Sequence, residues 1–118
     1  MPERKKFFLK IFKAELEDCL EDVEDLSLLG DRRRNCEEIT EYVYRENEAL
    51  LKREISGLKT VIASIDDFAL ERYDSVESLA AAVDDMIQKK VLEYENPEAV
   101  YGIAKRKLLK VLGYMNEQ

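Results

Sequence analysis

Residues 8–26 read FLKIFKAELEDCLEDVEDL, and their spacing decides the fold class. Apolar side chains recur in steps of 4, 4, 3, 4 and 3 residues, at Phe8, Phe12, Leu16, Cys19, Val23 and Leu26. Steps of three and four are the period of an α-helix with one apolar face. The sequence therefore predicts a helix over about residues 3–29, ended by Gly30, because glycine accepts the left-handed backbone that follows many helices.

A second long helix is expected over about residues 35–66. Its apolar residues run from Cys36 to Ile65 at a mean spacing close to the helical period. Asn35 followed by Glu38 has the form of a capping box, with Asp31 as a competing start. Gly57 in the middle of this segment indicates a bend or the close approach of a neighbouring helix.

Two polar residues interrupt the apolar stripe of this second segment. Glu46 and Asn47 stand where apolar residues are expected. Polar insertions of this kind can fix the register between packed helices, or can face solvent if the apolar stripe drifts.

Two shorter helices are expected in the rest of the chain. Asp74 with Glu77 offers a capping box for a helix over about 75–95, while residues 66–74 are either a break or a continuation of the second helix. Asn96-Pro97-Glu98 combines a cap residue, a proline suited to the first helical turn and an acid at the positive end of the helix dipole. This signal predicts a helix over about 97–112, ended at Gly113.

These segments predict one all-α domain over residues 1–118. We expect an antiparallel helical bundle made of a long hairpin (about 3–29 and 35–66) and two shorter helices (about 75–95 and 97–112). The hairpin is longer than the shorter helices can cover, so apolar surface is left over. A two-fold homodimer is the simplest way to bury that surface.

Composition narrows the class of protein. The 118 residues are 46% hydrophobic and 38% charged, with only 4 glycines and 2 prolines, as in a folded chain of long amphipathic helices. A net charge of −7 argues against nucleic acid as a partner. No apolar run approaches the length of a membrane span, and two cysteines do not form a disulfide framework, so we expect a cytoplasmic protein.

No catalytic constellation is present in the sequence. The chain has no histidine, which removes the commonest general base and the commonest transition-metal ligand. CxxC motifs and glycine-rich phosphate loops are also missing. We therefore expect no catalytic residue, no cofactor and no metal, and we interpret Cys19 and Cys36 as small core residues.

An acidic block lies in the first helix. Its members fall on neighbouring turns, where like charges repel: Glu15, Glu17, Asp18, Glu21, Asp22, Glu24 and Asp25. Three readings are open. Arg32, Arg33 and Arg34 can fold back on the acids, a basic protein segment can dock there, or a divalent cation can bind. The candidate interaction surface includes Glu17, Asp18, Glu21, Asp22 and Asp25.

Residues 4–13 are basic and carry Phe8 and Phe12, which completes the candidate surface. This segment resembles a membrane-surface helix, but its apolar stripe continues in phase to Leu26. The favoured reading is that Phe8 and Phe12 join the core or a dimer seam; a membrane surface and a partner's groove are the alternatives.

The leading functional hypothesis is a non-enzymatic protein–protein interaction module, such as an adaptor, a regulator or a chaperone-like bundle. One alternative is a peripheral membrane protein that uses the basic N-terminus. Another is a bundle that binds a ligand or metal through carboxylates.

Overall fold

A computed structural model describes residues 2–116 and contains four α-helices, with no strand among these residues. The helices are α1 (Pro2–Asn35), α2 (Glu41–Ile65), α3 (Val76–Glu93) and α4 (Glu98–Asn116). A short 3₁₀ turn, η1 (Leu70–Arg72), lies between α2 and α3. The predicted all-α bundle is confirmed, including the long hairpin and the shorter helical pair.

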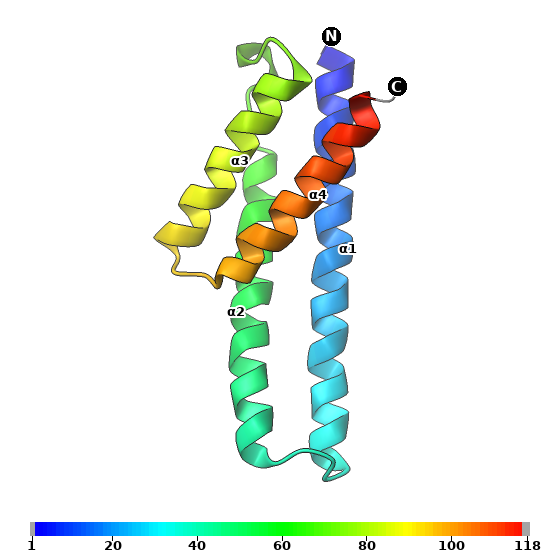
Figure 1. The fold of residues 1–118 in the computed structure, drawn as a ribbon, viewed down its shortest axis with the longest axis vertical. Helices are drawn as coiled ribbons and strands as arrows, with labels where there is room; N and C mark the ends of the chain where they lie inside the picture. The colour runs from blue at the N-terminus through cyan, green and yellow to red at the C-terminus, as the bar shows by residue number, and fades with distance from the viewer. Residues whose placement is uncertain (1, 117–118) are drawn as a thin grey trace.

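The two shorter helices cover only one half of the long hairpin (Figure 1). Helices α3 and α4 lie across the half that contains the chain's N-terminus, and the other half of α1 and α2 extends beyond them. The molecule measures 55 × 29 × 18 Å, and its radius of gyration of 16.6 Å exceeds the value of about 13.5 Å expected for a compact domain of this length. The hairpin is therefore an elongated projection from a smaller packed body.

The core lies entirely in the covered half. Its buried side chains come from all four helices: Phe8, Phe12 and Leu16 of α1, Leu58, Val61 and Ile65 of α2, Leu79, Val83 and Ile87 of α3, and Val100, Ala104, Leu108 and Val111 of α4. Burial of apolar surface is the main force that holds the helices together.

Both glycine stops predicted from the sequence are wrong. Helix α1 continues through Gly30 to Asn35, and α4 continues through Gly113 to Asn116. The left-handed position that ends α1 is taken instead by Glu37, whose φ is 59°. Three arginines in the last turn of α1 also stabilise the longer helix, because cations are favoured at a helix C-terminus.

Two predicted helix starts are also corrected. Helix α2 is capped by Thr40, whose hydroxyl accepts from the Val43 amide at 3.2 Å, and not by the Asn35–Glu38 pair. A reciprocal capping box opens α3, but it joins Ser75 and Ser78. Of the two readings left open for residues 66–74, the break is confirmed, because α2 ends at Ile65 and η1 follows.

The prediction of close approach at Gly57 is confirmed. A Cβ atom placed on Gly57 would lie 2.9 Å from Cγ2 of Val100 and 3.0 Å from Cγ of Asn96. The contact with Val100 is shorter than Cβ atoms adopt and the one with Asn96 is unusually tight, so glycine lets the start of α4 pack directly on the backbone of α2.

Gly57→Ala is therefore expected to destabilise the protein by about 1 kcal/mol, because overpacking outweighs the gain in helix propensity. Gly102→Ala is the matched control, since a Cβ on Gly102 meets nothing within 4 Å. The control should raise stability by up to about 1 kcal/mol. Urea unfolding of the two variants measures both changes, and equal stabilisation by the two would contradict the close approach.

Candidate functional site

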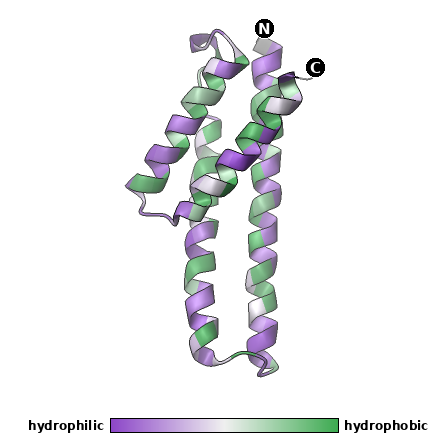
Figure 2. Ribbon diagram, in the orientation of Figure 1, coloured by the Kyte–Doolittle hydropathy of each residue, from purple (hydrophilic) through white to green (hydrophobic). Residues whose placement is uncertain are grey.

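The exposed half of the hairpin lacks a core of its own. No residue is buried from Glu24 to Ser56, although apolar side chains continue along both helices. Figure 2 shows hydrophobic residues on this part of α1 and α2, beyond the reach of α3 and α4. Leu26 is 54% exposed and Leu50 is 47% exposed. We call residues 24–56 the distal hairpin.

A groove runs between α1 and α2 in the distal hairpin, with a volume of about 240 Å³. We call it the tip groove, and it is lined by Leu26, Leu29, Gly30, Arg33, Ile39, Tyr44, Asn47, Glu48, Leu50 and Leu51. Leu26 and Gly30 follow the buried Val23 at helical steps, and Leu51 lies two turns before the buried Leu58. The groove is thus the uncovered continuation of the face on which α3 and α4 pack.

Polar contacts beside the groove hold the two helices in place. The Ser27 hydroxyl donates to Oε1 of Glu48 at 2.8 Å. The Tyr44 hydroxyl donates to Asp31, and the Arg34 guanidinium lies 4.1 Å from the centre of the Tyr44 ring. The hydrogen bond to Asp31 raises the pKa of Tyr44 above its ordinary value, with burial as a smaller cause. Contacts within the single chain therefore hold the two walls of the groove in place.

Asn47 lies in this groove, as its position on the core phase indicated. Glu46 is exposed. Asn47 is exposed as well, and its amide needs a hydrogen-bond partner only where the groove is covered by protein.

The structure exposes the acidic block and leaves most of it unpaired. Each of Glu17, Asp18, Glu21, Asp22 and Asp25 faces solvent, and within residues 2–116 no salt bridge joins any of these five to a basic side chain.

The arginines predicted to fold back on these acids have other contacts. Arg33 lies 3.9 Å from Glu38, and Arg34 packs on Tyr44. That reading of the acidic block is therefore wrong.

Glu15 is the member of the acidic block that is paired. Its carboxylate lies 3.1 Å from Nζ of Lys110 and 3.5 Å from Nζ of Lys107, so it joins α1 to α4. The hydrogen bond from Lys110 is the main reason why the pKa of Glu15 is lowered. Among residues 2–116, no group of three or more cysteines and acids has the geometry to hold a metal ion.

Phe8 and Phe12 belong to the core. Both are fully buried, and their rings stack with centroids 6.4 Å apart. The favoured reading is thus confirmed, and the two residues are removed from the candidate interaction surface. Lys5 is buried beside them and donates to the backbone oxygens of Leu70, at 2.7 Å, and Tyr73. In this fold the apolar face of residues 4–13 is not free to enter a lipid surface.

The two cysteines differ in their surroundings. Cys19 packs against the core from a half-buried position, and burial raises the pKa of its thiol. Cys36 is exposed in the turn after α1, so its interpretation as a core residue is wrong. The error follows from the helix boundary, because Cys36 was assigned to the stripe of a helix that begins only at Glu41. Both are free thiols.

A polar cluster between α3 and α4 was missed in the sequence. The Tyr101 hydroxyl donates to Oδ1 of Asp84 at 2.8 Å, and Nζ of Lys105 donates to Oδ2 at 3.0 Å. Burial acts to raise the pKa of Asp84, but these hydrogen bonds outweigh it and the pKa lies below its ordinary value. The spacing of Tyr101 and Lys105 on one helix face was the available signal. The cluster links two helices, and Tyr101 also lines an open hollow of about 420 Å³ together with Gln88 and Leu92.

Comparisons with models of protein families, with curated proteins and with solved structures found no match to this chain. Among the helices within residues 2–116, none combines the length and the apolar character that a bilayer crossing requires.

Asp84→Asn is expected to destabilise the protein at neutral pH by about 1–2 kcal/mol, because Asp84 accepts hydrogen bonds as an anion. Its pKa is lowered in the folded state, so the stabilisation is present above the ordinary pKa of 3.8 and is lost as the pH falls through the folded-state pKa. Thermal unfolding of both proteins from pH 7 to about pH 2 measures the difference. Asp85→Asn, at an exposed neighbouring position, is the control and should change little.

A gap between wild type and Asp84→Asn that stays constant down to the lowest pH would contradict the assignment of a charged acceptor.

Proposed function

We propose that this protein is a non-enzymatic protein–protein interaction module, of the adaptor, regulator or chaperone-like kind, that binds a helical protein segment in its tip groove. The observation that carries the proposal is the distal hairpin, where two amphipathic helices present apolar side chains and bury none. Contiguous exposed apolar surface on a folded protein marks an interaction site, since leaving it in water costs free energy.

The shape of the surface favours a helix as the bound element. On the same face of the hairpin, α3 and α4 already pack against α1 and α2. An amphipathic helix laid in the tip groove extends that packing, and helix-in-groove binding is a common mode of peptide recognition.

The remaining features agree with this role. Two free thiols suit a reducing compartment, and we propose the cytoplasm. An acidic surface with net charge −7 suits a protein partner better than nucleic acid. Partner identity is then set by the rim of the groove, where Arg33 and Glu48 lie beside leucines.

Leu50→Glu is expected to weaken binding of a partner by at least about 10-fold, because it places a charge in the apolar groove. Leu92→Glu is the matched control, since Leu92 is a 79% exposed leucine of α3 outside the groove. Both proteins should fold, because neither leucine is buried. Affinity capture with wild type and the two variants, followed by titration of the captured protein, measures the effect.

The proposal requires that Leu50→Glu loses a protein that Leu92→Glu retains. Equal binding by all three proteins would remove the tip groove as the binding site.

A further inference from the structure

We propose that the occupant of the tip groove is a second copy of this chain, docked antiparallel about a two-fold axis that passes beside Asn47. This inference rests on the proposed function and names its partner. It follows from three independent features of the distal hairpin: its free length, the charge pattern of α1 and the residues of α2 that face the groove.

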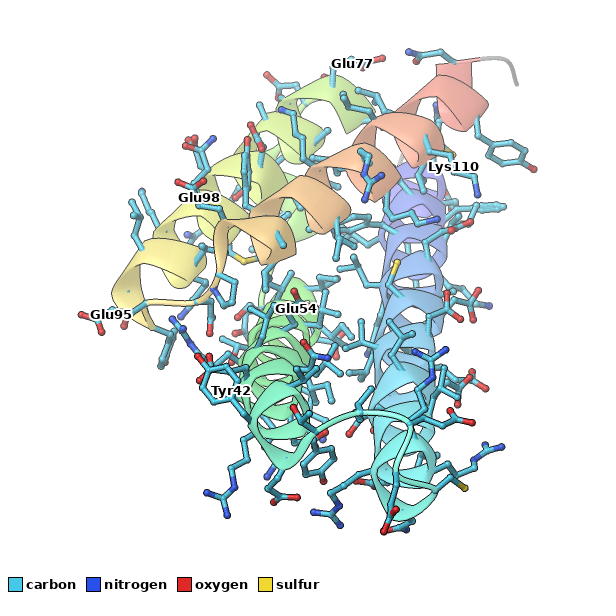
Figure 3. All side chains as sticks on the ribbon, turned by 60° about the horizontal axis from the view of Figure 1, so that its bottom comes forward. Tyr42, Glu54, Glu77, Glu95, Glu98 and Lys110 are labelled. Atoms are coloured by element: carbon cyan, nitrogen blue, oxygen red, sulfur yellow. The ribbon has the colours of Figure 1, made fainter. Side chains whose placement is uncertain are left out.

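The free length of the hairpin sets where the axis lies. The turn between α3 and α4 covers α2 as far as Arg53, whose Nη2 donates to the backbone oxygen of Glu95 at 2.8 Å. Figure 3 shows Glu95 in that turn and Tyr42 near the opposite end of the free part of α2. Helix α2 begins at Glu41, so Asn47 lies halfway between Glu41 and Arg53. A second tip docked antiparallel about Asn47 fills the free length and stops at the turn.

The charge pattern of α1 selects the antiparallel arrangement. Asp22, Leu26, Leu29 and Arg33 follow one another in steps of 4, 3 and 4 residues and form one stripe. Leu26, Leu29 and Arg33 line the tip groove, and Asp22 lines the adjoining hollow between α1 and α4. When the stripe is laid antiparallel on itself, Leu26 meets Leu29 of the second copy and Asp22 meets Arg33 of the second copy. In a parallel two-fold dimer through this face, α1 would instead face α2 of the second copy, and neither of these pairs would form.

Helix α2 gives the same axis. The hydrogen bond from Ser27 to Glu48 places the middle of the α1 stripe level with Asn47. About this level, Leu50 lies opposite Tyr44 of the second copy, and both residues line the groove. Asn47 then meets its own counterpart, so its amide gains a hydrogen-bonding partner when the groove is covered. A single asparagine in an apolar helical interface is a known device for fixing register.

The other orientations fail on shape. A parallel dimer through the same face would direct both pairs of shorter helices to one end, where α3 and α4 of the two copies would occupy the same space (Figure 1). Antiparallel docking places them at opposite ends. Because the contact is confined to the free half of one hairpin, we expect a small interface and a dimer that forms at high protein concentration and dissociates on dilution.

Cysteine cross-linking tests the register. The antiparallel axis that pairs Asp22 with Arg33 also brings Cys36 of one copy to Cys19 of the other. Within one chain the two cysteines are separated by about 25 Å along α1, beyond the reach of bis-maleimidoethane. A mixture of Cys19→Ser and Cys36→Ser should therefore cross-link into a covalent dimer, whereas Cys19→Ser alone, which keeps only Cys36, should not.

A cross-link in Cys19→Ser alone would mean that the tips meet side by side, and would overturn the register.

Charge reversal tests the pairing. Asp22→Arg and Arg33→Glu should each weaken the dimer by about 10-fold, because each turns two attractive contacts into two repulsive ones. Mixing the two variants should restore the affinity, because the mixed dimer again pairs opposite charges at both contacts. Asp85→Arg makes the same charge change at an exposed position on α3 and should leave the dimer unchanged. Sedimentation equilibrium and native mass measurement over a concentration series give the affinities.

The failure of this inference differs from the failure of the proposed function. A protein that stays monomeric at the highest concentration overturns the second copy as occupant; the function stands if Leu50→Glu still loses another protein. If neither charge reversal changes the dimer affinity, the antiparallel pairing is overturned. If Leu50→Glu also leaves the dimer affinity unchanged, the tip groove is not the contact site of the dimer.

Discussion

The structure depends on the burial of the Phe8 and Phe12 rings against side chains of the other helices. Both rings are fully buried, and replacing such a residue by alanine typically costs about 3–5 kcal/mol. This packing fixes α1 beneath α3 and α4, and it is confined to one half of the hairpin. The other half is held by helix–helix contact and by polar bonds such as Ser27 to Glu48. The exposed apolar surface of the distal hairpin arises because the core ends before the helices do.

The helical period was enough to predict the all-α fold class and most of the arrangement of the helices. The stripe from Phe8 to Leu26 predicts α1, and Asn96-Pro97-Glu98 predicts the start of α4 within one residue. The expectation of leftover apolar surface is also confirmed, since it follows from helix lengths alone. Gly57 was informative for a related reason: a glycine within a helix costs stability, so its presence indicates a neighbour that needs the space.

The helix ends, the helix caps and the contacts between helices could not be predicted from single residues. Gly30 permits a helix to end but does not force it to, and three following arginines favour continuation. Several neighbouring residues can each serve as an N-cap, and in the structure Thr40 and Ser75 are the caps in place of the expected residues. Pairing across helices requires a known register, which is why the cluster of Asp84 with Tyr101 was missed. The arginines were expected to fold back on the acids of α1 because they were assigned to a turn after Gly30, whereas they lie on the same continuous helix as the acids.

We propose that the distal hairpin, which its own chain packs weakly, is covered by protein from outside. Amide hydrogen exchange tests it most directly, because opening free energies rise with burial. In dilute protein, amides of residues 41–54 should exchange at least about tenfold faster than those of residues 57–65, and raising the protein concentration should slow exchange in 41–54 but not in 57–65. Equal protection of the two segments in dilute protein, unchanged by concentration, would contradict the account.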